Sequence, residues 1–247
     1  MLTLRSYRDY PDAFSGDRGA DFLSEEECME YNGLSFGPGR ASWLLSRIAT
    51  KEMVLRYCDT RLDFVPDPSE VTLIRKSETE IGVKVHAPNA PPVPELRAVF
   101  GTSDHYVVSC LREAQAGEEF AIQLKRVHSR YPFAEQGQYA SEEWDQVRFA
   151  AAEEADRILT GLDCVREALQ RVTPEAKGIR IQHLSLKGDC SLTSPGNGAM
   201  HAGCWYFDHH VMAVAFAWSA PHAGPVPGAR VEEDPVLPES RHSEITL

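Results

Sequence analysis

A mid-chain segment in which apolar and polar side chains alternate constrains the fold more than any other part of the sequence. Within residues 117–127, the alternating side chains are Phe120, Ile122 and Leu124 on one side and Ala121, Gln123 and Lys125 on the other. A period of two is typical of a half-buried strand, so Gln123 and Lys125 share a face away from the apolar side. About half of the chain lies on each side of this strand. We therefore expect it at or near the boundary between two halves.

Each half also contains a strong helical pattern. Residues 40–57 carry apolar side chains at helical spacing, and a shorter helix before them begins with Ser24 and Glu27 as a capping box and ends near Gly33. In the second half, Ser141 is the expected N-cap of a long helix that Gly161 ends or kinks, with a further amphipathic turn or helix over residues 162–172.

Strand-like segments accompany both helices. We expect strands at residues 71–74, 81–85, 96–100, 105–111 and 178–186, a loop at 187–201 and a hairpin or strand pair at 204–218. This distribution favours an α+β protein of two similar lobes, residues 1–115 and 116–219, over a doubly wound parallel sheet. Residues 220–247 are rich in proline and acidic side chains without apolar periodicity, and we expect a solvated, disordered tail.

Charge and cysteine usage limit the partners and the compartment. The 247 residues carry a formal net charge of −12, which argues against general nucleic-acid or anionic-membrane binding. The six cysteines contain no CxxC pair, there is no apolar leader, and no apolar run approaches a membrane span. These features predict a cytoplasmic protein with reduced cysteines, and we expect a monomer.

Two groups of chemically competent side chains allow more than one interpretation. Arg40, Arg47 and Lys51 lie almost on one line of a helix, either as a solvated basic face or as a phosphate-binding ridge. Metal-competent residues gather near the C-terminus, namely Cys190, His201, Cys204, Asp208, His209 and His210. Their spacing fits no standard zinc pattern, so core cysteines and surface histidines are favoured over a metal site. Hydrolase, P-loop and Rossmann fingerprints do not occur.

Several segments, in order along the chain, resemble the Sfp-type 4′-phosphopantetheinyl transferases. Residues 40–51 resemble the family's R-x-x-W-L-L-G-R-x-A-x-K run, and residues 103–108 resemble the segment after its I-S-H-S motif. Residues 121–125 fall where the family has G-[IV]-D-[IL]-E, and residues 149–155 fall where it has W-x-x-K-E-A. The loop and helix start at 129–143, the ending at 160–162 and the Trp205 segment also resemble family segments.

The resemblance implies a pseudo-twofold, two-lobed 4′-phosphopantetheinyl transferase fold, in which each lobe is a small antiparallel sheet with a long helix. In that family, coenzyme A binds between the lobes and Mg²⁺ bridges its pyrophosphate. The phosphopantetheine arm is transferred to a serine of an acyl or peptidyl carrier protein. Coenzyme A or a phosphopantetheine group is therefore the expected ligand, and a carrier protein the expected partner.

The resemblance also assigns candidate site residues. The matching catalytic positions are Gln123, Lys125, Glu153 and Glu154, and the matching coenzyme A positions are Arg40, Arg47, Lys51, Thr102 and Ser103. Of three family carboxylates that bind the metal, only Glu154 remains, and the Lys125 ammonium would repel a cation beside it by several kcal/mol at roughly 4 Å. We therefore expect ordinary Mg²⁺ binding to be lost.

Three interpretations of this site follow. In the first, the protein is a catalytically silent relative. In the second, Lys125 replaces the metal as a counter-charge, or the cleft has been turned to different chemistry. In the third, the register is shifted so that Glu118 and Glu119 serve as ligands. We expect an accessory or repurposed protein of carrier-protein-dependent biosynthesis of polyketides, fatty acids or nonribosomal peptides. The alternatives are an active divergent transferase and a non-catalytic module that binds coenzyme A or a carrier protein.

Overall fold

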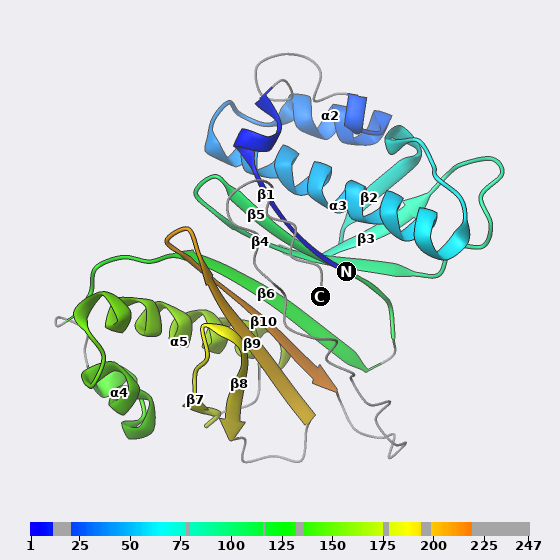
Figure 1. The fold of residues 1–247 in the computed structure, drawn as a ribbon. Helices are drawn as coiled ribbons and strands as arrows, with labels where there is room; N and C mark the ends of the chain where they lie inside the picture. The colour runs from blue at the N-terminus through cyan, green and yellow to red at the C-terminus, as the bar shows by residue number, and fades with distance from the viewer. Residues whose placement is uncertain are drawn as a thin grey trace. The chain divides into compact units, whose positions relative to one another are not determined.

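The structure, a computed structural model, describes residues 1–11, 21–77, 80–115, 117–131, 136–174, 178–193 and 199–218. These residues form two compact units, which we call the first unit (Met1–Ala114) and the second unit (residues 115–218). Each unit combines an antiparallel five-stranded sheet with α-helices, as Figure 1 shows. The α+β class expected from the sequence is therefore confirmed, and so is the antiparallel sheet in each half.

The first unit begins with a strand, continues with helices and ends with four strands. Its elements are β1 (Leu2–Ser6), α2 (Glu25–Gly33), α3 (Pro38–Leu62), β2 (Val71–Arg75), β3 (Glu80–Val85), β4 (Leu96–Ser103) and β5 (Tyr106–Glu113). The strand order in the sheet is β1-β5-β4-β3-β2. Short 3₁₀ helices at Tyr7–Asp9 and Pro68–Glu70 follow β1 and precede β2.

The second unit repeats this plan. Its elements are β6 (Glu118–Arg126), α4 (Ser141–Arg148), α5 (Ala152–Val172), β7 (Arg180–His183), β8 (Lys187–Thr193), β9 (Ala199–Phe207) and β10 (His210–Trp218). The strand order is β6-β10-β9-β8-β7. In both units the first strand pairs with the last one, and the remaining strands follow in reverse order.

The repeat extends to individual residues. The register pairs Ser6 with Tyr106 in the first unit and Arg126 with His210 in the second. Just beyond each pair, the backbone N–H of Tyr7 donates to the His105 carbonyl at 3.1 Å, and that of Val127 donates to the His209 carbonyl at 2.7 Å. Arg5 of β1 therefore occupies the same position as Lys125 of β6.

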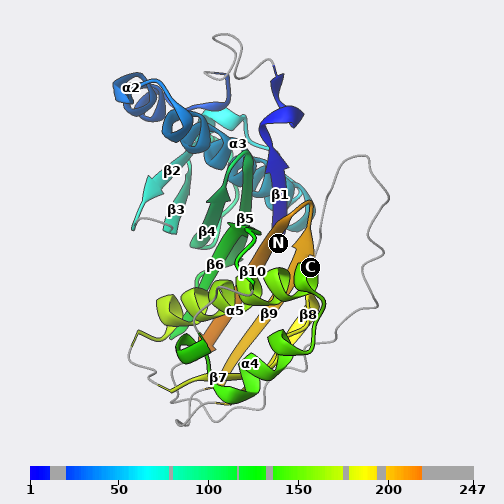
Figure 2. The same ribbon diagram turned by 90° about the vertical axis from the view of Figure 1, so that its left-hand side faces the viewer.

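One face of each sheet packs against the long helix. In the second unit, α5 lies across β6, β9 and β10, as Figure 2 shows. Its fully buried side chains Leu159, Leu162 and Leu169 belong to one core cluster with Ala213 and Val211 of β10. Each fully buried leucine contributes about 1.5–3 kcal/mol, so this apolar stripe holds the helix on the sheet.

Several sequence predictions fail in the second unit. The helix expected from Ser141 is broken at Phe149–Ala151 into α4 and α5, and its N-cap is Ala140 rather than Ser141. Gly161 does not end α5, which continues to Val172. A Cβ at Gly161 would lie 2.6 Å from Leu184 Cδ2, so the absence of a side chain lets the helix approach its neighbours closely.

The loop expected at residues 187–201 contains strand β8 and the start of β9 instead. Strand β8 reads KGDCSLT, and only two of these seven residues are apolar. Its pattern is therefore too polar to predict a strand from the sequence. The tail expected at residues 220–247 lies outside the described residues.

No α-helix in the described ranges is both long and apolar enough to span a membrane.

Candidate functional site

Gln123 and Lys125 both bind the carboxylate of Glu167 on α5. Gln123 Nε2 donates to Glu167 Oε2 at 3.0 Å, and Lys125 Nζ donates to Glu167 Oε1. The two side chains share a face, as the alternation predicts. Their cross-strand partners are Ala213 and Val211, which belong to the core beneath α5. Gln123 and Lys125 thus lie opposite Phe120, Ile122 and Leu124, as predicted, but their own face is not a free polar surface, because it packs against the helix of the same unit.

Glu167 is the acceptor that the two strand side chains share. An amide N–H and an ammonium group each take one oxygen of a carboxylate, so neither oxygen lacks a donor. The Lys125 and Glu167 side chains remain 33% and 42% exposed, and solvent screens the pair. Exposed ion pairs contribute about 0.2–1 kcal/mol, so this one fixes a geometry more than it stabilises the fold.

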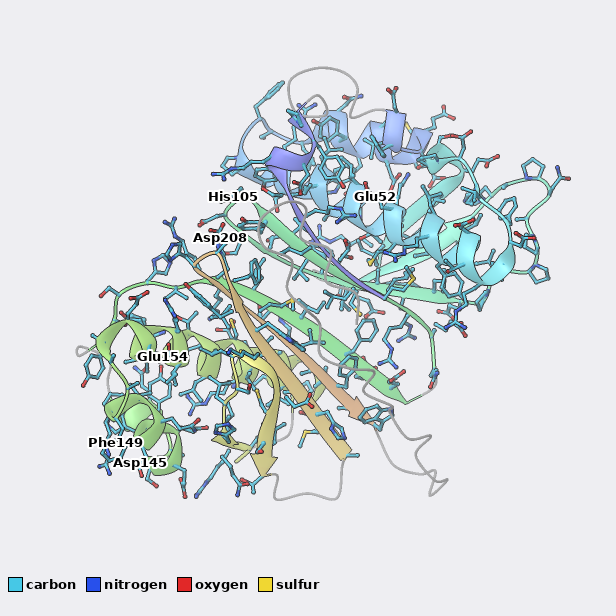
Figure 3. All side chains as sticks on the ribbon, in the orientation of Figure 1. Glu52, His105, Asp145, Phe149, Glu154 and Asp208 are labelled. Carbon is cyan, nitrogen blue, oxygen red and sulfur yellow. The ribbon has the colours of Figure 1, made fainter. Side chains whose placement is uncertain are left out.

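The other two candidate catalytic residues lie at the far end of α5. Glu153 and Glu154 are exposed in its first turn, where both form ion pairs with Arg157; Glu154 is labelled in Figure 3. Glu154 and Glu167 are thirteen positions apart on α5, which corresponds to about 20 Å along the helix axis. Mg²⁺ binds its oxygen ligands at about 2.0–2.1 Å. The four candidates therefore do not converge on one cation.

The shifted register does not assemble a metal site either. Glu118 and Glu119 are neighbours on β6, where they pair with Trp218 and Ala217 of β10 and point to opposite faces. Glu119 shares the face of Gln123, but four strand residues separate them, which is about 13 Å. We conclude that the residues of β6 and α5 at these positions do not fit Mg²⁺.

Arg47 and Lys51 are buried in the first unit. Lys51 Nζ lies 2.5 Å from Glu27 Oε2 and donates to the Pro68 carbonyl at 2.9 Å, with 0% and 2% of the Lys51 and Glu27 side chains exposed. Arg47 Nε lies 3.8 Å from Glu27 Oε1. Burial lowers the pKa of both cations, and the Glu27 carboxylate opposes that shift. The solvated basic face that the spacing favoured is therefore wrong.

Arg40 is the remaining member of the predicted line and lies at the start of α3. Its guanidinium carbon is 4.0 Å from the centre of the Tyr31 ring and 4.4 Å from that of Phe36. Trp43 stacks on Tyr31 at 5.7 Å, and Phe36 is 92% exposed. We call these four residues the aromatic–arginine stack. It fixes a partly exposed guanidinium between two rings, a geometry suited to a planar or anionic ligand.

Thr102 and Ser103 close strand β4, before the turn to β5. Thr102 is exposed and Ser103 is half-buried, and they pair with Val107 and Tyr106. His105 lies at the tip of this hairpin, and Asp208 lies at the tip of the corresponding β9–β10 hairpin (Figure 3). Both hairpins contain an aspartate followed by a histidine, with Asp104 and Asp208 at positive φ.

Sequence reasoning missed a buried glutamate that is repeated in both units. Glu27 and Glu143 are the third residues of α2 and α4, and each accepts the backbone N–H of its N-cap, Ser24 at 2.9 Å and Ala140 at 2.7 Å. Each also accepts a strand N–H, from Leu73 of β2 at 3.3 Å and from Ile181 of β7 at 3.0 Å. We call them the latch glutamates.

Each latch glutamate also pairs with a cation of the long helix. Glu27 pairs with Lys51 of α3, and Glu143 pairs with Arg166 of α5. The only signal in the sequence was the capping box at Ser24 and Glu27. The second box is hidden because Ala140 has no side-chain oxygen, although Glu143 still accepts its backbone N–H.

The residue after each helix cation completes the repeat. Glu52 of α3 binds Arg5 of β1, with Arg5 Nε 2.8 Å from Glu52 Oε2, and Glu167 of α5 binds Lys125 of β6. The Tyr10 hydroxyl donates to Glu52 at 2.6 Å, as Gln123 donates to Glu167. Lys125 thus occupies a position that is cationic and helix-bound in both units. This repeat accounts for Lys125 as part of the framework.

No protein-family model matches the chain, and no curated protein matches it at a significant level. Among the residues that the structure describes, no group of three or more His, Cys, Asp or Glu side chains could hold a metal ion.

Proposed function

We propose that this chain is a phosphopantetheinyl-transferase-like protein without the Mg²⁺-dependent transfer reaction. It acts as an accessory or repurposed protein in carrier-protein-dependent biosynthesis of polyketides, fatty acids or nonribosomal peptides. The proposal is supported by the ordered resemblance of several segments and by two α+β units of one topology. The coenzyme A ligand, the carrier-protein partner and a cytoplasmic location are parts of the same proposal.

The observation that carries the loss of transfer is the bond of Gln123 and Lys125 to Glu167. Attack of a serine hydroxyl on a pyrophosphate needs a hard cation that neutralises the charge developing on the phosphate oxygens. Gln123 offers a neutral amide in place of a carboxylate, with its N–H bound to Glu167, and the Lys125 ammonium repels a cation. Glu167 itself is already neutralised by Lys125.

A second candidate function is a non-catalytic module that binds coenzyme A, and the aromatic–arginine stack favours it. Arg40 offers a cation to a phosphate, and the exposed ring of Phe36 offers a flat surface to an adenine. Arg47 and Lys51 are bound to Glu27 in the core and contribute less to such a site. Binding of coenzyme A would then depend on Arg40 more than on the buried pair.

The transfer experiment separates a silent protein from an active one. The protein is incubated with coenzyme A, Mg²⁺ and an apo carrier protein, and the carrier is weighed by mass spectrometry beside a reaction with an authentic transferase. We expect no mass gain with this chain and a full gain with the control enzyme. A carrier heavier by one phosphopantetheine would contradict the proposal and favour an active divergent transferase.

Calorimetric titration with coenzyme A tests the module. We expect Arg40→Ala to weaken binding about tenfold and Arg56→Ala, an exposed arginine of the same helix, to leave it unchanged. Equal affinity of Arg40→Ala and the unmodified chain would exclude the aromatic–arginine stack as the binding site.

Carrier proteins are usually acidic, so their docking to a chain of net charge −12 should weaken as the ionic strength is lowered.

A further inference from the structure

Two cysteines of the second unit lie side by side on neighbouring strands. The β8–β9 register pairs Gly188 with Cys204 and Cys190 with Ala202, so the cysteines are diagonal neighbours on one face. That face packs against α5, with Cys204 fully buried in the core and Cys190 half-buried at its margin. None of the candidate transferase residues contacts this pair in the hydrogen bonds and ion pairs of the described residues.

The two thiols are chemically unequal because they hydrogen-bond to each other. This bond lowers the pKa of Cys190 below its ordinary value, while burial opposes the shift. The same bond and burial raise the pKa of Cys204 well above its ordinary value. Cys190 is therefore the thiol of the pair that loses its proton more readily, and the thiolate is the nucleophilic form.

The surroundings also make Cys190 the sulfur that meets a reagent. Cys204 Sγ lies against α5, where a Cβ on Gly161 would be 3.5 Å from it. The third cysteine of the cluster, Cys164, donates to the Val211 carbonyl at 3.4 Å, and burial raises its pKa to about 12. An oxidant from solvent thus reaches Cys190 first, with Cys204 as its nearest thiol.

We propose that Cys190 and Cys204 are a peroxide-oxidised dithiol whose product is a disulfide between β8 and β9. The Cys190 thiolate attacks one oxygen of hydrogen peroxide and breaks the O–O bond, which gives a sulfenic acid and, after protonation, one water. The sulfur of Cys204 then attacks the Cys190 sulfur, loses its proton and displaces the second water. Two thiols are oxidised to one disulfide while one peroxide is reduced to two waters.

The end of the β8–β9 ladder gives the strands room for this bond. Cys190 is the last residue of β8 that pairs with β9, and Ser191, Leu192 and Thr193 pair with β7 instead. Diagonal neighbours have Cα atoms about 7–8 Å apart, whereas disulfides usually span about 4.4–6.8 Å. The strands must therefore approach slightly at this end, and we expect a disulfide that mild thiols reduce.

The full-length chain is treated with hydrogen peroxide at neutral pH, blocked with N-ethylmaleimide and analysed by intact and tandem mass spectrometry. We expect a product lighter by two hydrogen atoms, a peptide linking Cys190 to Cys204, and full reversal by dithiothreitol. Cys204→Ser should stop at a Cys190 sulfenic acid that dimedone traps. Cys28→Ser, a half-buried cysteine of the first unit, is the matched control and should still form the link.

Three results would overturn the proposal. The first is a Cys190 that gains oxygen atoms in the unmodified chain without any link to Cys204. The second is oxidation of Cys28 while Cys190 stays reduced, and the third is a link from Cys190 to a different cysteine. Because each result is measured on the unmodified chain, the outcome does not depend on whether the serine variants fold.

Discussion

At the scale of single residues, a cationic side chain on the first strand of each unit pairs with a carboxylate on the long helix that packs against it. In the proposed function Lys125 corresponds to a metal ligand of the phosphopantetheinyl transferases, and in the structure its ammonium binds Glu167 of the same unit. Arg5 makes the same kind of contact with Glu52 in the first unit. The position selects a cation because a helix carboxylate lies opposite it.

Reversing the charge at Lys125 tests this account. Lys125→Glu places two carboxylates together in the second unit, and we expect the free energy of unfolding to fall by about 1 kcal/mol because the pair is partly exposed. Adding Glu167→Gln to this variant should restore most of the loss. Urea denaturation measures both variants. Lys84→Glu, at an exposed lysine of β3, is the matched control and should change stability little.

Restoration by Glu167→Gln is the critical result. If the double variant is no more stable than Lys125→Glu alone, Glu167 is not the partner that defines the position.

Tyr57 provides a residue-scale prediction for alkaline pH. Its hydroxyl donates to Glu113 Oε1 at 2.6 Å, and burial together with this bond raises the pKa of Tyr57 from 10.0 to about 12. The folded state therefore retains the proton that the unfolded state loses, so this contribution is complete below pH 10 and is lost as the pH rises towards 12.

Replacing Tyr57 by phenylalanine should remove this part of the pH dependence. We expect Tyr57→Phe to be less stable than the unmodified chain below pH 10 and to lose less further stability above it. Denaturant midpoints on both sides of pH 10 measure the difference. Tyr31→Phe is the control. Parallel curves for Tyr57→Phe and the unmodified chain across this range would contradict the assignment.

At the scale of elements, each unit is held by one carboxylate that joins three of them. Glu27 joins α2, α3 and β2, and Glu143 joins α4, α5 and β7. Both glutamates are almost fully buried. A buried carboxylate with several donors positions its elements, whereas removal of one partner leaves another charge unpaired.

Glu27→Gln should cost more stability than Glu143→Gln. The first leaves the fully buried Lys51 ammonium without its counter-charge, and we expect a loss of about 3–5 kcal/mol. The second leaves Arg166, whose side chain is 25% exposed, and we expect about 2 kcal/mol because solvent screens that charge. Denaturation curves compare the two variants.

Lys51→Met in the Glu27→Leu background supplies the control, because it removes both charges of the pair. This double variant should be more stable than Glu27→Gln. If Glu27→Gln and Glu143→Gln lower the free energy of unfolding by the same small amount, burial of the partner charge does not distinguish the two latch glutamates.

The parts of the fold that were predictable are those with a local signal. The Ser24–Glu27 capping box and the alternation in β6 are confirmed, because both patterns are complete within a few residues. Strand β8 was missed because its sequence lacks apolar alternation. The break between α4 and α5 was missed because it contains neither proline nor glycine. The partners of Lys125 and Lys51 were missed because they lie 42 and 24 positions away, beyond any helical or strand period.

At the scale of the whole molecule, one plan is used twice with few identical residues. Both sheets have the same strand order, and the two latch glutamates, the helix cations and the strand cations occupy corresponding positions. Only the coarse repeat of a long helix with several strands is visible in the sequence, because the charged residues at corresponding positions differ between the units. Arg5 corresponds to Lys125, and Lys51 corresponds to Arg166.

If each unit unfolds cooperatively on its own, replacing a latch glutamate should destabilise only the unit that contains it. Glu143→Gln should speed amide hydrogen exchange within residues 115–218 and leave the protection of Met1–Ala114 unchanged, and Glu27→Gln should do the reverse. The reason is that each glutamate bonds only to residues of its own unit among its described partners. Hydrogen-exchange mass spectrometry measures both variants, and each variant serves as the control for the other. Loss of protection across both units in either variant would show that the chain opens as a single cooperative body.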